Sequence, residues 1–82
     1  MMQVRVRFFA SLRDAVGRAE QSLELPAGAT VETAWTTLCA ERPELGPRRA
    51  SLAAAVNRRY GKFDAPLADG DELAFLPPVS GG

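Results

Sequence analysis

The most distinctive chemistry of the 82-residue chain lies in residues 76–82, which read Leu-Pro-Pro-Val-Ser-Gly-Gly. The two prolines favour an extended polyproline conformation, which would hold this segment away from the domain that precedes it. Gly81 and Gly82 have no side chain, so their backbone can pass through a channel too narrow for a Cβ atom. We therefore expect residues 77–82 to form a flexible tail that places its terminal carboxylate in the active site of another protein.

A carboxylate is a poor electrophile, and the simplest way to activate it is to form an acyl-adenylate with ATP. Sulfur that replaced AMP would leave a thiocarboxylate, which is a good nucleophile, whereas an amine would form an isopeptide bond. The sequence has no G-x-x-x-x-G-K-[ST] phosphate loop. We therefore expect this chain to bind no cofactor and a partner enzyme to consume the ATP.

The composition argues against several classes of protein. Ten basic and ten acidic residues give a net charge of zero, whereas proteins that bind nucleic acids or anionic membranes carry a basic excess. There is no histidine, and Cys39 is the only cysteine, so an intrachain disulfide, a cysteine zinc cage and a self-contained hydrolase are all disfavoured. Without a membrane-length apolar run or a signal peptide, the expected location is cytoplasmic.

Alternation of apolar and polar residues predicts a strand over residues 3–9, with Phe9 as a large aromatic side chain on its polar face. A turn or two of helix ending at Gly17 should follow. Alternation then resumes in a second strand, which ends at Pro26. We expect these two strands to form a hairpin. Its inward-facing residues are Val4, Val6, Phe8, Leu23 and Leu25.

One main helix is predicted between Thr30 and Pro43. The Thr30 hydroxyl can accept a hydrogen bond from a free N–H of the first turn, and Glu32 places a negative charge where the helix dipole favours it. An apolar stripe should cover the sheet, with the cysteine packed inside rather than reactive. The stripe consists of Val31, Ala34, Trp35, Leu38 and Cys39.

The second half of the chain gives weaker signals. Residues 41–52 contain two prolines and a glycine, and are predicted as a loop with at most a short helical turn. A short apolar strand over 52–57 and a turn-rich segment over 58–70 should follow. Alternation in 71–77 predicts a last strand, and Pro77 should end its pairing because it has no N–H. One helix on one face of a sheet gives an α+β class.

Three stretches of the sequence resemble the MoaD-like family, the ubiquitin-like, sulfur-carrying small subunits of molybdopterin synthase. They are VRVRFFASLRDAVG at 4–17, AAAVNRRY at 53–60 and LADGDELAFLPPVSGG at 67–82, and the last is the most specific. The resemblance implies a β-grasp fold over residues 1–76, with one main helix packed on one face of a mixed sheet. It also implies that the first and last strands lie side by side at the centre of that sheet.

The resemblance further implies a reaction sequence that begins at Gly82. In this family a MoeB-like, ubiquitin-activating-like adenylyltransferase adenylates the terminal glycine, and a sulfur donor protein converts it to a thiocarboxylate. The tail then enters the active site of a large, MoaE-like subunit and passes sulfur to cyclic pyranopterin monophosphate in molybdenum cofactor biosynthesis. The family's synthase is a heterotetramer whose catalytic side chains belong to the large subunit, so this chain would be no enzyme alone. Gly81 matches the functional terminus with Gly82, and the inserted tail matches Pro77, Pro78, Val79 and Ser80.

A partner must also hold the domain itself. Phe9 and Leu76 both fall on faces opposite the expected core, and neighbouring first and last strands would bring them together, with Tyr60 beside them. Exposed contiguous apolar area often marks an interface, although single exposed apolar residues are common. Basic residues gather in the second half of the chain and are expected to be solvated, or to face an acidic partner. They are Arg48, Arg49, Arg58, Arg59 and Lys62.

Three other functions remain open at this point. One is a carrier of the same fold for another pathway, such as thiazole synthesis for thiamine, although the ending FLPPVSGG suits the molybdopterin branch better. Another is a ubiquitin-like modifier that forms isopeptide bonds through Gly82. The third is an interaction module with an inert tail, since a Gly-Gly end is often only a frayed terminus.

Overall fold

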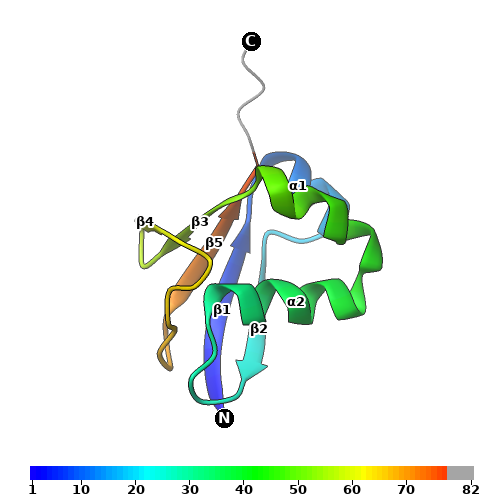
Figure 1. The fold of residues 1–82 in the computed structure, drawn as a ribbon. Coiled ribbons are helices and arrows are strands. Elements are labelled where there is room, and N and C mark those ends of the chain that lie inside the picture. Colours follow the sequence, from blue (N-terminus) through cyan, green and yellow to red (C-terminus); the bar gives the residue numbers. More distant parts are fainter. Residues whose placement is uncertain (78–82) are drawn as a thin grey trace.

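The computed structural model describes residues 1–77, which fold around one five-stranded sheet (Figure 1). The strands lie in the order β2-β1-β5-β3-β4, and only the β1–β5 pair is parallel. The first and last strands are therefore neighbours at the centre, and the α+β, β-grasp architecture is confirmed. The elements are β1 (Met2–Phe8), α1 (Ala10–Val16), β2 (Glu20–Leu25), α2 (Val31–Glu41), the 3₁₀ segment η1 (Pro43–Ser51), β3 (Ala53–Val56), β4 (Arg59–Gly61) and β5 (Glu72–Leu76).

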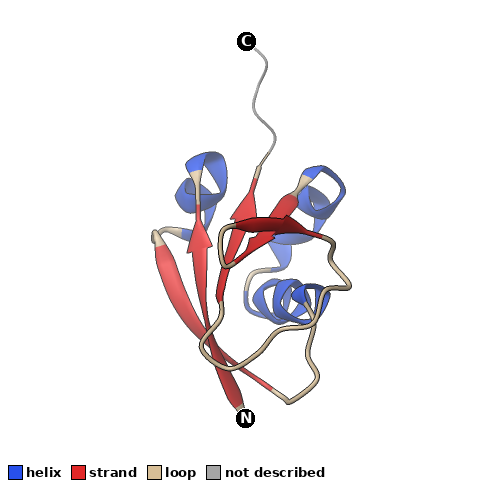
Figure 2. Ribbon diagram, turned by 90° about the vertical axis from the view of Figure 1, so that its left-hand side faces the viewer, coloured by secondary structure: helices blue, strands red, loops and turns tan. Residues whose placement is uncertain are grey.

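The hydrophobic core lies between one face of this sheet and α2. In Figure 2 the strands lie nearer the viewer and the helices lie behind them. Trp35 of α2 packs edge-on against Phe75 of β5, with 5.1 Å between the ring centroids, and both side chains are buried. The inward residues predicted from alternation are all in this core: Val4, Val6, Phe8, Leu23, Leu25, Leu73 and Phe75.

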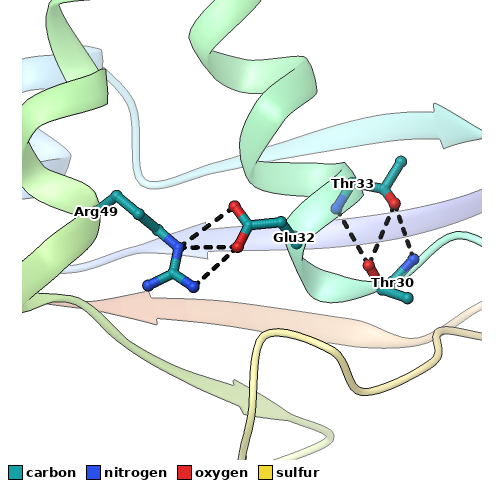
Figure 3. Close-up of polar contacts among 4 residues, drawn as sticks. All are labelled: Thr30, Glu32, Thr33 and Arg49. Carbon is teal, nitrogen blue, oxygen red and sulfur yellow. Dashed lines mark hydrogen bonds and ion pairs between the residues drawn. The ribbon is translucent and has the colours of Figure 1, made fainter.

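Local sequence signals fix the ends of the two α-helices. Helix α1 ends at Gly17, whose φ of 88° is left-handed and whose N–H donates to the Arg13 carbonyl. Helix α2 begins after Thr30, whose Oγ1 accepts from the Thr33 N–H at 3.3 Å (Figure 3). The Thr33 hydroxyl accepts from the Thr30 N–H in return, at 3.1 Å. This reciprocal pair is a capping box, so the predicted N-cap is confirmed.

One of the basic residues, Arg49, joins three parts of the fold. Its Nη2 donates to Glu32 Oε1 at 2.8 Å and its Nε donates to both carboxylate oxygens (Figure 3). The same guanidinium lies 3.4 Å from the centroid of the Phe63 ring, which is cation–π contact. The Glu32 N–H donates to the Phe63 carbonyl at 2.8 Å. These contacts hold η1 and the segment after β4 against the start of α2.

Four expectations about local structure were wrong in detail. The first strand covers Met2–Phe8 rather than 3–9, because Phe9 becomes the N-cap of α1. The expected loop over 41–52 contains the nine-residue η1, in which tight turns accommodate the prolines. The turn-rich segment holds β4, which forms by pairing with β3. Cys39 is only half-buried, although it packs against the core as expected.

Candidate partner-docking surface

The face of the sheet opposite α2 carries a shallow hollow that we call the outer groove. It has a volume of about 220 Å³. Phe9, Tyr60 and Leu76, which the sequence places away from the core, all line it. The remaining lining residues are Arg7, Ala55, Arg58, Glu72 and Ala74.

Strand register explains why the groove forms at this place. Arg7 pairs with Ala74, Ala74 pairs with Ala55, and Ala55 pairs with Tyr60, so these four residues form one row across β1, β5, β3 and β4. Directly paired residues point to the same face of a sheet. The two alanines have short side chains and form a low floor between larger neighbours. The groove therefore forms because the short alanine side chains leave a depression between the longer side chains on either side.

Two residues that line the groove are exposed aromatics. Tyr60 is 81% exposed and Phe9 is 37% exposed. The Arg7 guanidinium lies 5.4 Å from the centroid of the Phe9 ring. Large exposed aromatics beside a cation are enriched at protein interfaces. The structure thus brings the three predicted residues to one surface, while their role in partner binding stays a prediction.

The groove lies beside the end of the last strand. Leu76 is the final residue of β5 and pairs with Ala53, and Pro77 lies outside the ladder, as predicted from its missing N–H. A partner seated in the groove would therefore also meet the chain where it leaves the sheet. The other predicted tail residues lie outside the described part of the structure: Pro78, Val79, Ser80, Gly81 and Gly82.

Several groove residues were missed by sequence reasoning. Arg7 and Ala74 lie on the polar faces of strands that were correctly predicted, but their partnership requires the parallel β1–β5 register. Ala55 depends on the β3–β4 hairpin, which the sequence did not reveal, and the same hairpin brings Arg58, one of the five basic residues noted in the sequence, to the groove. The alternation of side chains along a strand tells which face of the sheet each residue occupies. Only the order of the strands in the sheet tells which residues of different strands lie next to one another.

Other features of the described residues offer less chemistry. A second, more polar hollow of about 310 Å³ lies further from the end of β5 and is lined by Gln3, Val4, Arg5, Ser22, Gly70 and Glu72. Within residues 1–77, no three metal-ligating side chains come together, and no helix has the length and apolar character to cross a membrane. Burial, with a smaller contribution from Glu32, raises the pKa of the Cys39 thiol above its ordinary value.

Comparison with known protein sequences finds close relatives over the whole length. The chain is 42% identical to the molybdopterin synthase sulfur carrier subunit of Escherichia coli K12, over 96% of this chain and 99% of that protein. It is 37% identical to the protein of the same name from Chlamydomonas reinhardtii, over 99% of this chain and all of that protein. Both alignments include the region that contains the outer groove.

Solved structures show the same fold. SAMP1, the small archaeal modifier protein 1, from Haloferax volcanii matches with a TM-score of 0.88 and 28% identity, over 98% of this chain and 99% of that one. A chain in the complex of subunits 1 and 2 of the molybdopterin-converting factor from Helicobacter pylori matches with a TM-score of 0.69 and 27% identity, over 99% of this chain and all of that one. The ThiS family model matches residues 6–82, and the chain therefore belongs to the ThiS family, within which it groups with the molybdopterin synthase sulfur carrier subunits.

Proposed function

We propose that this chain is the sulfur-carrier subunit of a molybdopterin synthase. The observation that carries the proposal is the 42% identity to the Escherichia coli sulfur carrier subunit, which spans nearly all of both chains. The likeness to a chain from a complex of subunits 1 and 2 supports a large-subunit partner. The cytoplasmic location remains a prediction from the sequence.

The reaction centres on the carboxylate of Gly82. A MoeB-like enzyme consumes ATP, releases pyrophosphate and joins AMP to the glycine carboxylate. The outer sulfur of a persulfide on a donor protein then bonds to the acyl carbon while the bond between that carbon and the oxygen of AMP breaks. A thiol next attacks the donor's own sulfur, forms a disulfide with it and releases the Gly82 thiocarboxylate. In the large subunit the thiocarboxylate sulfur bonds to a carbon of cyclic pyranopterin monophosphate and displaces an oxygen substituent. Water then cleaves the bond between that sulfur and the acyl carbon, and Gly82 returns to a carboxylate. Two such rounds supply the two sulfurs of the dithiolene.

The domain supplies docking rather than catalysis. The outer groove presents Phe9, Tyr60 and Leu76 next to the end of β5. A MoaE-like subunit that covered the groove would receive the tail from Pro77 onward without a long connecting segment, which reduces the entropy lost on insertion. We propose that the complex is a heterotetramer, with two carriers on two large subunits.

A second candidate is a protein modifier, which the similarity to small archaeal modifier protein 1 favours. It would use the same adenylated Gly82, but a lysine amine rather than sulfur would attack the acyl carbon. The fold suits both outcomes, since each needs only a docking face and an activated terminus. The higher identity to named sulfur carriers places this candidate second.

Intact-mass spectrometry separates the candidates. The purified chain is incubated with ATP, an activating enzyme of the MoeB type and a sulfur donor. A carrier gains about 16 Da, the mass difference between sulfur and oxygen. A modifier instead forms covalent adducts with lysines of other proteins, and an inert tail shows neither change. Absence of the mass gain with an activating enzyme that works on its own carrier would refute the proposal.

The decisive activity test uses the thiocarboxylated chain with a large subunit and cyclic pyranopterin monophosphate. We expect conversion to molybdopterin. The matched control is a variant extended by one alanine after Gly82, which keeps the domain and the groove but moves the carboxylate to a residue with a Cβ atom. Conversion by the untrimmed extended variant at the parent rate would contradict the role of Gly82.

A further inference from the structure

The hairpin between β3 and β4 holds two consecutive residues in the left-handed region. Asn57 has a φ of 51° and Arg58 has a φ of 71°. Two left-handed residues are the signature of a type I′ turn, the turn that matches the twist of a two-residue hairpin. Asparagine is favoured at the first position and glycine at the second. Arg58 therefore occupies a site where an arginine is strained and a glycine would be relaxed.

The contacts of Asn57 account for its conformation. Its Nδ2 donates to Asp71 Oδ1 at 2.9 Å, and its Oδ1 accepts from the Glu72 N–H at 3.0 Å. These bonds connect the hairpin to the start of β5, and they stabilise the left-handed conformation of Asn57 from within the domain. The left-handed asparagine is also the least costly non-glycine residue for such a site.

The contacts of Arg58 do not account for its conformation. Its Nε lies 3.8 Å from Glu72 Oε1, which is beyond hydrogen-bond distance, and its side chain is 84% exposed. An ion pair of this kind contributes little to stability. The chain thus carries local strain at Arg58 without a matching internal gain, and such strain is typical of sites that act on a partner.

The position of Arg58 indicates what it would recognise. It lines the outer groove beside Tyr60, above the floor made by Ala55 and Ala74. Arg7 also lines the groove, so its charged lining consists of two guanidinium groups and the single carboxylate of Glu72, which is a positive excess. The groove is complementary to a partner that places an apolar side chain over the alanines and a carboxylate next to Arg58.

We propose that Arg58 is a specificity-determining residue, which binds a carboxylate of the large subunit at the rim of the outer groove. The inference rests on the proposed function, since it requires that the large subunit covers this groove. The large subunit is the occupant that fits, because Leu76 both lines the groove and ends β5, directly before the tail that the proposed function inserts into that subunit.

The test compares three variants by thermal unfolding of the isolated chain and by calorimetric titration with the purified large subunit of the same organism. Arg58→Gly relaxes the turn and removes the charge. We expect its melting temperature to rise by about 2–5 °C, since the relief of strain exceeds the entropy gained by the unfolded chain. We also expect its Kd for the large subunit to rise about three- to fivefold, with a weaker dependence of Kd on salt.

Two controls separate charge recognition from other causes. Arg58→Lys keeps the positive charge and the strained backbone, so we expect both readouts to stay near those of the parent. Arg59→Ala removes an equal charge from the neighbouring residue, whose β3 partner is Val56 rather than Ala55, so its side chain lies on the other face of the hairpin. We expect this variant to bind like the parent.

The outcomes distinguish this proposal from the one on which it rests. If the parent chain does not bind the large subunit, the proposed function fails and Arg58 has no partner to recognise. If the parent binds and Arg58→Gly binds equally tightly, the role of Arg58 is refuted while the proposed function stands. Equal weakening by Arg58→Gly and Arg59→Ala would also refute it, because overall charge would then explain both. A lower melting temperature for Arg58→Gly would refute the strain argument.

Discussion

Replacing Tyr60 by alanine should separate partner binding from folding. The side chain is 81% exposed in the isolated domain, whereas Phe75 on the opposite face of the sheet is fully buried. Tyr60 lies on the three-residue edge strand β4 opposite Ala55, and its exposure leaves little of its surface to pack on the domain. Its removal should therefore shift the melting temperature of the isolated chain by no more than about 2 °C.

The effect on binding follows from the area that a partner would cover. A tyrosine presents roughly 200 Å² of surface when accessible, and about four-fifths of it is free here. At about 25 cal/mol per Å², complete burial would contribute about 4 kcal/mol. Incomplete burial and lost side-chain freedom reduce this to about 2 kcal/mol, or roughly a 30-fold weaker complex with the large subunit for Tyr60→Ala.

Calorimetric titration of the parent, Tyr60→Ala and Tyr60→Phe with the large subunit measures this effect. The phenylalanine variant keeps the ring and loses only the hydroxyl, so its affinity should stay within a few-fold of the parent. Thermal unfolding of each isolated variant serves as the control for folding. An unchanged Kd for a well-folded Tyr60→Ala would show that the partner does not cover this end of the outer groove.

Three further predictions concern the fold around α2. Arg49→Ala should lower the unfolding free energy by about 1 kcal/mol, because it loses both the partly exposed ion pair with Glu32 and the cation–π contact with Phe63. Urea unfolding of a double-mutant cycle with Glu32→Gln should give a coupling energy of about 0.5 kcal/mol, and additive effects would show that the pair contributes nothing. Thr30→Ala removes one half of the capping box and should cost about 1 kcal/mol, seen as a fall of about 4–8 °C in the melting temperature; an unchanged melting temperature would rule out a stabilising cap. Since burial raises the pKa of Cys39, its thiol should react with iodoacetamide at about pH 8 more slowly in the folded chain than in urea, and equal rates would contradict the shift.

The parts of the fold that follow from local patterns were predicted from the sequence. Alternation in β1 and β5 identified their inward residues, and the Thr30 cap and Gly17 marked helix ends, because each of these signals acts within a few residues. Strand β4 was missed because its three residues have no periodicity of their own and acquire strand structure only from pairing with β3. The parallel β1–β5 pair came from the resemblance to a known family, since no local pattern specifies which strands become neighbours.

The candidate site was predicted in part for the same reason. Phe9 was predicted to lie in the first strand, whereas it is the N-cap of α1. Its side chain was nevertheless predicted on the correct face of the sheet, because its backbone is extended like that of the strand before it. Tyr60 and Leu76 joined it through strand order alone. The sequence did not distinguish Arg58 from the other basic residues around it, because its unusual backbone conformation depends on the turn between β3 and β4.

The central place of β5 has a consequence for how the protein is made. This strand joins β1–β2 on one side to β3–β4 on the other, so a nascent chain that has not reached residue 72 holds two separate pairs of strands. Isolated two-stranded hairpins are at best marginally stable in water. We therefore expect the domain to reach its full stability only after the last strand has left the ribosome, because the five-stranded sheet and the buried Trp35–Phe75 contact both require β5.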